Sequence, residues 1–221
     1  MAKTDTAIQK ALGRDLVEAR DIRESDNGLV LHQVAQPGIG AAIWRRRLAP
    51  AFAEWIEGIP VGQLPALRAL VDFRAVENCV HAACDLSGLP AGTMRDILAS
   101  DIGALALMLA QVMQNPLLHI RLEAVTTDAC RRFHIDQIPA RLLCTYRGPG
   151  TQFGVQDCSG QVVPADEMRV GDAAILRGGL WPDMEVTRLL HRSPPIAETG
   201  QVRLFLALDP ATEPPGARRL H

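Results

Sequence analysis

The sequence predicts an α+β protein in which an α-rich N-terminal region packs against a β-rich C-terminal barrel. Up to Met113, apolar residues recur at three- and four-residue steps, which is the spacing of amphipathic helices. After Pro116 they alternate with polar residues, and short strand-like segments separated by Gly and Pro turns follow one another to residue 209. Many short strands with such turns are typical of a sandwich, a jelly roll or a closed barrel.

The expected division of the chain follows these changes in pattern. The 221 residues suit one domain, with room for an appendage. Charged residues cluster in residues 18–26, and proline and glycine are frequent near the C-terminus. We therefore expect four segments, which are a flexible N-terminal tail over residues 1–27, an α-rich region over 28–116, a β-rich core over 117–209 and a flexible C-terminal tail over 210–221.

Two short strands and a helix are expected at the start of the α-rich region. Residues 29–34 and 41–44 have the composition of strands, and a Pro-Gly turn ends the first of them. Pro50 suits the first turn of a helix over residues 51–56, because the missing N–H of proline is not needed there.

Further helices are expected over residues 64–113. The apolar spacing there is helical, with a break at residues 87–90. Thr93 is a suitable N-cap for one short helix, and Ser100 or Asp101 for a second that runs to the end of this stretch.

The β-rich core is expected to hold several short strands. Gly-containing turns separate them, as at residues 148–150, 171–172 and 178–179. The expected strands cover residues 118–124, 133–136, 141–146, 151–155, 173–177, 186–191 and 202–208.

Composition excludes several classes of protein. The formal net charge of −2 gives no reason to expect nucleic acid or an anionic membrane as a partner. The apolar run over residues 102–113 is too short to span a membrane. The five cysteines are an odd number without Cys-x-x-Cys spacing, so we expect reduced thiols in a cytoplasmic protein. Cys130 and Cys144 are expected to be small buried apolar residues.

One pair of residues suggests metal chemistry. His134 and Asp136 are two positions apart, which on an extended strand directs both side chains to the same face. A second histidine from another strand completes the two-His, one-carboxylate set expected for non-haem Fe(II). His191, 57 positions after His134 (191 − 134), lies in such a strand. A lone histidine in a strand is more often a core residue, so the hypothesis depends on all three residues converging.

Arg203 is the second unusual feature of the β-rich core. It interrupts the apolar strand over residues 202–208, where a buried guanidinium group needs a partner. A ligand carboxylate would satisfy it with a bidentate interaction. The alternative is an internal ion pair with Asp172 or Glu185.

This constellation resembles the Fe(II)- and 2-oxoglutarate-dependent oxygenase superfamily. The resemblance rests on His134-x-Asp136, on His191 and on Arg203 twelve positions later (203 − 191). It covers about residues 117–209 and implies a double-stranded β-helix, the jelly-roll barrel of that superfamily. It implies that the three residues hold the metal and that Arg203 holds the far carboxylate of 2-oxoglutarate. Two further residues are expected at the same mouth, as weaker cofactor-binding candidates: Tyr146 and Arg147.

The local amino-acid sequence resembles a bacterial domain family of unknown function, numbered 1826, over most of the chain. The matching stretches are Arg132-Phe133-His134-x-Asp136, residues 142–151 and residues 191–195. This resemblance supports homology and carries no activity.

Three functions remain open at the level of sequence. The first is an iron-dependent oxygenase that uses 2-oxoglutarate on an unidentified small-molecule or protein substrate. The second is a cupin-like protein that binds zinc or another divalent ion, because the same ligands suit zinc with one open position. The third is a barrel without metal that serves as an interaction module. The N-terminal half is expected to form either a wall of the substrate site or a homodimer contact.

Overall fold

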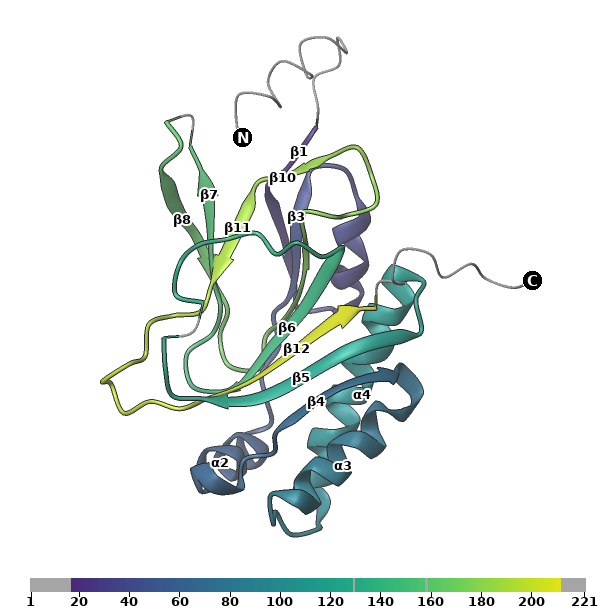
Figure 1. The fold of residues 1–221 in the computed structure, drawn as a ribbon, viewed down its shortest axis with the longest axis vertical. Helices are drawn as coiled ribbons and strands as arrows, with labels where there is room; N and C mark the ends of the chain where they lie inside the picture. The colour runs from purple at the N-terminus through teal and green to yellow at the C-terminus, as the bar shows by residue number, and fades with distance from the viewer. Residues whose placement is uncertain (1–16, 129, 158, 212–221) are drawn as a thin grey trace, which may run out of the picture.

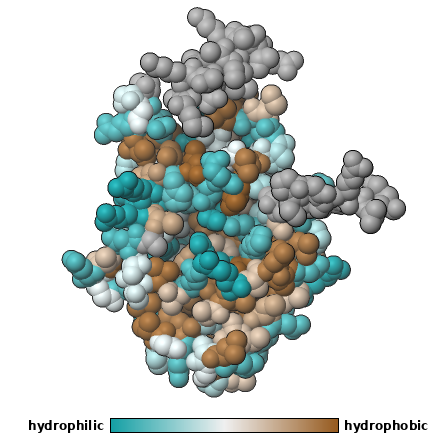
Figure 2. Space-filling model, viewed as in Figure 1, coloured by the Kyte–Doolittle hydropathy of each residue, from teal (hydrophilic) through white to brown (hydrophobic). Residues whose placement is uncertain are grey.

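The computed structural model describes residues 17–128, 130–157 and 159–211. Two β-sheets face each other, and helices cover the outer face of the larger sheet (Figure 1). In the same view, Figure 2 shows hydrophilic side chains over the middle of the molecule and hydrophobic ones both toward the end that carries α2 and α3 and near the opposite end. The molecule is therefore a mixed α/β, strand-rich protein.

The larger sheet has seven strands in the order β2-β3-β9-β6-β12-β5-β4. Neighbours are antiparallel except β2 and β3, which are parallel. Its strands are β2 (Asp21–Ser25), β3 (Ile39–Trp44), β4 (Leu67–Asp72), β5 (Leu117–Val125), β6 (Ala140–Arg147), β9 (Ala173–Arg177) and β12 (Arg203–Pro210).

The smaller sheet has the order β11-β7-β8 and is antiparallel. Apolar side chains of the two sheets meet between them, among them Phe153, Leu143 and Leu189. A short parallel pair, β1 with β10, lies beside the sheets. The bounds are β1 (Glu18–Ala19), β7 (Gln152–Gln156), β8 (Val162–Glu167), β10 (Val186–Thr187) and β11 (Leu189–Arg192).

The helices pack on the face of the larger sheet that is turned away from the smaller one. α4 contacts β12, β5 and β6, and its residues Leu98, Ile102, Leu105 and Leu109 are fully buried. By length and composition α4 is apolar enough to cross a membrane, yet here this row of side chains fills the main core of the fold. The helical segments are η1 (Gly28–Ala35), α2 (Pro50–Gly58), η2 (Val61–Gln63), η3 (Phe73–Ala75), α3 (Val76–Leu86) and α4 (Thr93–Met113).

The expected division of the chain needs correction. Helices do occupy much of residues 28–116, but β3 and β4 of that region join the same sheet as β5, β6, β9 and β12. The boundary expected at residue 117 therefore runs through one sheet. Residues 18–25 of the expected N-terminal tail form β1 and β2, and residues 1–16 lie outside the described residues. At the C-terminus, Pro210 of the expected tail belongs to β12 and pairs with Leu118 of β5. Residues 212–221 lie outside the described part.

Three local predictions in the N-terminal half are wrong. Residues 29–34 form the 3-10 helix η1, because Asn27 accepts a hydrogen bond from the N–H of Leu29 and starts a helical turn. Residues 67–72 form strand β4, although an outward-facing Leu70 mimics helical spacing. α4 is one helix, because Asp101 turns toward Arg46 and does not cap.

The β-rich half follows the prediction more closely. β5, β6, β7, β9, β11 and β12 fall within or near the expected ranges, while β8 was not expected. Residues 133–136 are the exception, because they form no regular strand and make a single bridge to β11. That bridge contains the first candidate metal ligand.

Candidate metal centre

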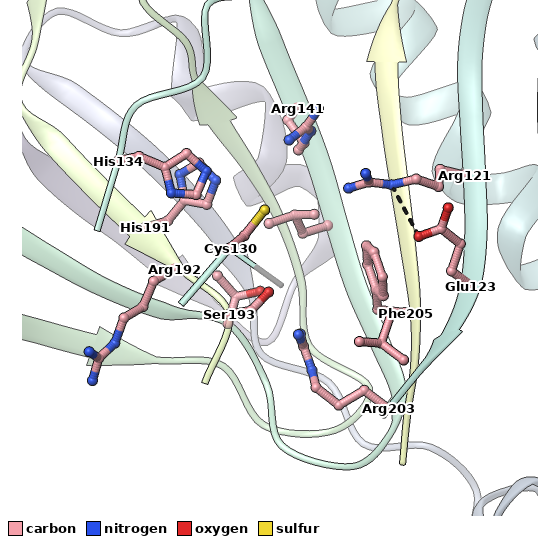
Figure 3. Close-up of a pocket in the computed structure, with 13 residues that line it drawn as sticks. Arg121, Glu123, Cys130, His134, Arg141, His191, Arg192, Ser193, Arg203 and Phe205 are labelled. Atoms are coloured by element: carbon pink, nitrogen blue, oxygen red, sulfur yellow. Dashed lines mark ion pairs between the residues drawn. The ribbon is translucent and has the colours of Figure 1, made fainter. Parts of the chain in front are cut away.

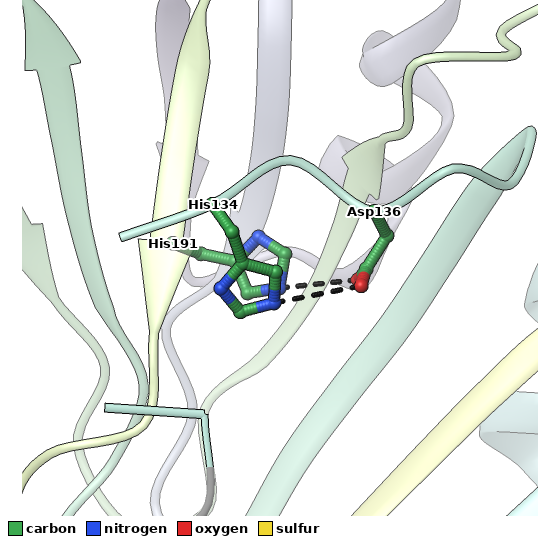
Figure 4. Close-up of side chains that lie close together, drawn as sticks. All are labelled: His134, Asp136 and His191. Carbon is green, nitrogen blue, oxygen red and sulfur yellow. Dashed lines mark ion pairs between the residues drawn. The ribbon is translucent and has the colours of Figure 1, made fainter. Parts of the chain in front are cut away.

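His134 and His191 are neighbours because their backbones pair. The N–H of each residue donates to the carbonyl oxygen of the other at 3.0 Å. The loop between β5 and β6 thus acts as a short extra strand along β11 (Figure 4). The imidazole rings lie 4.5 Å apart between centroids, and Asp136 completes the cluster from two positions further along the loop.

The three side chains have the spacing of adjacent ligands around one ion. Asp136 Oδ2 lies 3.2 Å from His191 Nε2, and Asp136 Oδ1 lies 3.5 Å from His134 Nε2 (Figure 4). The potential ligand atoms all lie within 4.8 Å of one another. Neighbouring positions of an octahedron with ligand distances of 2.0–2.2 Å are about 3 Å apart, so a small shift would bring all three onto one ion.

The tautomer of His134 suits metal binding. Its Nδ1 lies 2.8 Å from the carbonyl oxygen of Arg132, which accepts hydrogen bonds and cannot donate. Nδ1 therefore carries a proton, which leaves Nε2 as the nitrogen that would bind a metal once it has given up its own proton. Such outer contacts fix the ring orientation of metal-binding histidines.

The charges around Asp136 keep it ionised. Arg141 Nη1 donates to Asp136 Oδ2 at 2.6 Å and holds Asp209 with Nε and Nη2 at 2.7 Å each. Burial opposes ionisation of Asp136, but the hydrogen bonds from both imidazoles and the charge of Arg141 outweigh it, so its pKa falls well below the usual range. Burial lowers the pKa of His191, whereas hydrogen bonding to Asp136 raises that of His134. An ionised carboxylate and a neutral buried imidazole are what a divalent cation needs.

A glycine turn after β9 holds the loop that carries Asp136. The N–H of Gly179 donates to the carbonyl oxygen of Asp136 at 2.8 Å, and that of Gly178 to Pro139 at 2.9 Å. A Cβ on Gly178 would lie 1.9 Å from the carbonyl oxygen of Ile138 and 2.9 Å from that of Asp136. The turn therefore positions the carboxylate only while residue 178 has no side chain.

Replacing Gly178 with alanine is expected to destabilise the fold and displace Asp136. Overpacking of this kind costs about 1–3 kcal/mol of unfolding free energy, and urea denaturation measures it. Gly62→Ala is the matched control, because nothing lies within 4 Å of a Cβ there. A Gly178→Ala variant with the stability and Zn(II) affinity of Gly62→Ala would contradict this role of the turn.

A cavity next to the two histidines reaches Arg203 (Figure 3). The side chain of Arg203 is buried, and its contacts are with neutral groups. Nε donates to the carbonyl oxygen of Pro149 at 2.7 Å, and Nη2 lies 3.5 Å from Thr145 Oγ1. Burial lowers the pKa of Arg203 to about 10, which leaves it charged at neutral pH. In the described part of the chain, no carboxylate lies within ion-pair distance of it.

The internal partners considered for Arg203 are engaged elsewhere. Asp172 accepts hydrogen bonds from Arg45 at 2.9 Å and from the N–H of Arg46 at 3.1 Å. Glu185 accepts from Arg177 at 2.9 Å. The alternative of an internal ion pair is therefore wrong.

Tyr146 and Arg147 do not line this cavity, which corrects the expectation for them. Tyr146 is buried on the helical side of β6, where its hydroxyl donates to Asp101 Oδ2 at 2.6 Å. Arg147 reaches α2, donating to the carbonyl oxygen of Ile59 at 2.8 Å with Glu57 at 3.4 Å. Alternation along β6 and a bulge opposite Leu204 turn both side chains away from the histidines.

Several residues of the site were not anticipated. Arg141 joins Asp136 to Asp209, a contact that depends on a residue 68 positions away. Arg121 lines the cavity from β5. Cys130 is exposed at the cavity, so the expectation of a buried residue is wrong for it and right for Cys144. The sequence signal for Arg121 and Arg141 was their place in strands whose alternate residues are apolar, which puts both arginines on the face opposite the apolar side chains.

Two solved plant structures have a similar fold. One is dioxygenase for auxin oxidation 1 from Arabidopsis thaliana in a binary complex with 2-oxoglutarate, with a TM-score of 0.55 at 12% identity, covering 88% of this chain and 93% of that one. The other is the dioxygenase for auxin oxidation in rice, with a TM-score of 0.53 at 13% identity, covering 87% and 83%. At such identities the likeness shows the fold alone, which is the jelly roll of 2-oxoglutarate oxygenases.

The sequence itself defines the family. Residues 25–209 match the family described as "Protein of unknown function (DUF1826)", and the chain belongs to it. None of the curated proteins matches the chain. The resemblance to this family is thus confirmed, and the resemblance to the oxygenase superfamily is supported at the level of the fold.

Proposed function

We propose that the protein is a non-haem Fe(II)- and 2-oxoglutarate-dependent oxygenase. One observation carries the proposal: two histidines and a carboxylate converge at a cavity that also holds a buried arginine without a carboxylate partner among the described residues. Two imidazoles and one carboxylate are the ligand set of Fe(II) enzymes that activate oxygen. The complex of the Arabidopsis dioxygenase with 2-oxoglutarate supports the same cosubstrate here.

Each residue has a distinct role in this proposal. His134, Asp136 and His191 would hold the metal, and Arg203 would hold the distal carboxylate of 2-oxoglutarate. Iron and cosubstrate together supply oxidation of a substrate C–H bond coupled to decarboxylation of the keto acid. The protein orients the ligands through Arg132 and Arg141 and excludes water with the apolar residues between its sheets.

A zinc-binding protein with the same ligands is the second candidate. Zinc accepts two histidines and one carboxylate with a position left open. A zinc-binding protein of this kind would gain nothing from Arg203, because a buried guanidinium group without a carboxylate partner destabilises the folded protein when no ligand is bound. The buried arginine therefore favours the oxygenase. A cytoplasmic location and a homodimer remain predictions.

Anaerobic titration of the protein with Fe(II) and then 2-oxoglutarate tests the proposal. We expect a weak visible charge-transfer band that appears only with both additions and is lost in His134→Ala, because the ligand set is then incomplete. His32→Ala is the control, since His32 is an exposed histidine of η1 away from the cavity. Zinc binding without 2-oxoglutarate binding would favour the zinc-binding protein. A protein that binds neither metal nor 2-oxoglutarate would exclude both candidate functions.

A further inference from the structure

Four arginines line the cavity of the candidate metal centre: Arg121, Arg141, Arg192 and Arg203. Three have their guanidinium groups committed. Arg141 binds two carboxylates, and Arg203 is assigned to the cosubstrate. Arg192 donates to Gln152 at 2.8 Å, lies 4.5 Å from the ring centre of Phe133, and points away from the cavity in Figure 3.

In the described part of the chain, Arg121 makes a single long ion pair, with Glu123 (Figure 3). Among the described residues it donates no hydrogen bond, and its Nε lies 3.8 Å from Glu123 Oε2, beyond hydrogen-bond distance. The other oxygen of Glu123 is bound by Arg68 at 2.6 Å, which draws this carboxylate away. Arg121 thus presents a cation with free donors.

The position of Arg121 is set by aromatic packing. Its guanidinium carbon lies 5.1 Å from the ring centre of Phe205, and that of Arg203 lies 5.4 Å from the same ring. Figure 3 shows Arg121 extending across β12 toward Arg141 and the cavity. Stacking on a ring limits the motion of a guanidinium group and leaves its edge available for a bidentate anion.

The remaining surface of the cavity is apolar in part. Val125, Leu143 and Phe205 are among the residues that line it. A ligand there would meet hydrophobic side chains along its body and, at one end, the guanidinium group of Arg121 with Glu123 beside it.

From these contacts we infer that Arg121 is a substrate-binding residue and that the substrate carries a carboxylate or phosphate on a small apolar body. The inference rests on the proposed function, because it assigns Arg203 to the cosubstrate and leaves Arg121 for the substrate. Guanidinium–carboxylate and guanidinium–phosphate contacts are the strong, bidentate class of hydrogen bond.

The test is calorimetric titration of protein saturated with Zn(II) and 2-oxoglutarate. The anionic probes are phenylacetate, hexanoate and phenyl phosphate, and their neutral counterparts are phenylacetamide, hexanamide and phenol. We expect at least one anion to bind roughly tenfold to a hundredfold more tightly than its counterpart, which corresponds to a charged hydrogen bond. The carboxylates and the phosphate distinguish the two kinds of anionic group.

Three variants complete the experiment. Arg121→Gln is expected to abolish the preference for the anion, and Arg121→Lys to retain part of it. Arg74→Gln is the control, because Arg74 is an exposed arginine paired with Asp72 away from the cavity. The affinity for 2-oxoglutarate should be unchanged in all three.

Several results would overturn the inference. They are equal binding of anions and neutral counterparts, no binding of any anion, a preference that survives in Arg121→Gln, and weaker 2-oxoglutarate binding in that variant. The last would mean that Arg121 holds the cosubstrate. Failure of 2-oxoglutarate to bind the wild-type protein, seen before any probe is added, would count against the proposed function. The probes would then be titrated into the Zn(II)-loaded protein alone, and a preference for the anion that depends on Arg121 would still support the inference.

Discussion

Replacing Arg203 with glutamine is expected to weaken 2-oxoglutarate binding by roughly 30-fold to 1,000-fold. The guanidinium group is buried, and its contacts in the described part of the chain include a backbone carbonyl, a hydroxyl and the ring of Phe205, all of them neutral. A carboxylate that enters the cavity would therefore form its only charged contact in the described part of the chain. Loss of one partner from a buried charge pair costs about 2–4 kcal/mol of binding free energy, which gives this range. Calorimetry on Zn(II)-loaded protein measures it.

The same variant separates a cosubstrate site from a structural arginine. Because Arg203→Gln removes a desolvated charge from the ligand-free protein, the free energy of unfolding should stay within about 1 kcal/mol of wild type. Zn(II) affinity should also be unchanged, since Arg203 is no member of the triad. Arg192→Gln is the control, because Arg192 points away from the cavity (Figure 3). Large destabilisation with unchanged 2-oxoglutarate affinity would assign Arg203 to the fold.

The convergence of the candidate site was predictable because it depends on few features. His134 and Asp136 share a face wherever the backbone is extended, and a single bridge to β11 is enough to extend it. Arg203 was recognisable as a buried cation within an apolar strand. Neither inference required the order of the strands.

Residues whose direction depends on tertiary pairing were not predictable in the same way. Tyr146 is a different case, because it has the same parity along β6 as Leu142 and Cys144, which face the helices, and alternation alone should have argued against its role at the cavity. Arg147 is turned by a bulge that no sequence signal marks. The contact of Arg141 with Asp209 needs β6 and β12 to be neighbours.

The division into regions failed for a related reason. A strand such as β4 is short, and its outward Leu70 gives Leu67, Leu70 and Val71 the spacing of a helix. Its pairing with β5, which decides the matter, is antiparallel and follows two helices in the chain. Periodicity within one segment cannot reveal a partner that lies 45 (117 − 72) to 55 (122 − 67) residues further on.

Replacing Asp101 with alanine is expected to cause a large loss of stability away from the candidate site. Asp101 accepts hydrogen bonds from Arg46 Nη2 at 2.8 Å and from the Tyr146 hydroxyl at 2.6 Å. Burial lowers the pKa of Arg46, but the hydrogen bonds to Asp101 outweigh it, so Arg46 stays charged inside the protein. Without Asp101 this charge loses its carboxylate partner.

The expected cost is about 3 kcal/mol of unfolding free energy, at the lower end for a broken buried pair. Arg46 keeps its bond to the carbonyl oxygen of Gly171 at 2.6 Å and its contact with Trp44, which limits the loss. In a chain of this length, that cost lowers the melting temperature by roughly 6–12 °C. Thermal and urea denaturation measure both values.

Two further variants identify the broken ion pair as the cause. Ser100→Ala, an exposed neighbour on the same helix, should change the unfolding free energy by less than about 0.5 kcal/mol. Combining Arg46→Met with Asp101→Ala should restore part of the stability, because the double variant no longer buries an unpaired charge. If the double variant is as unstable as the sum of the single ones, the two side chains act independently, and the cost arises from packing.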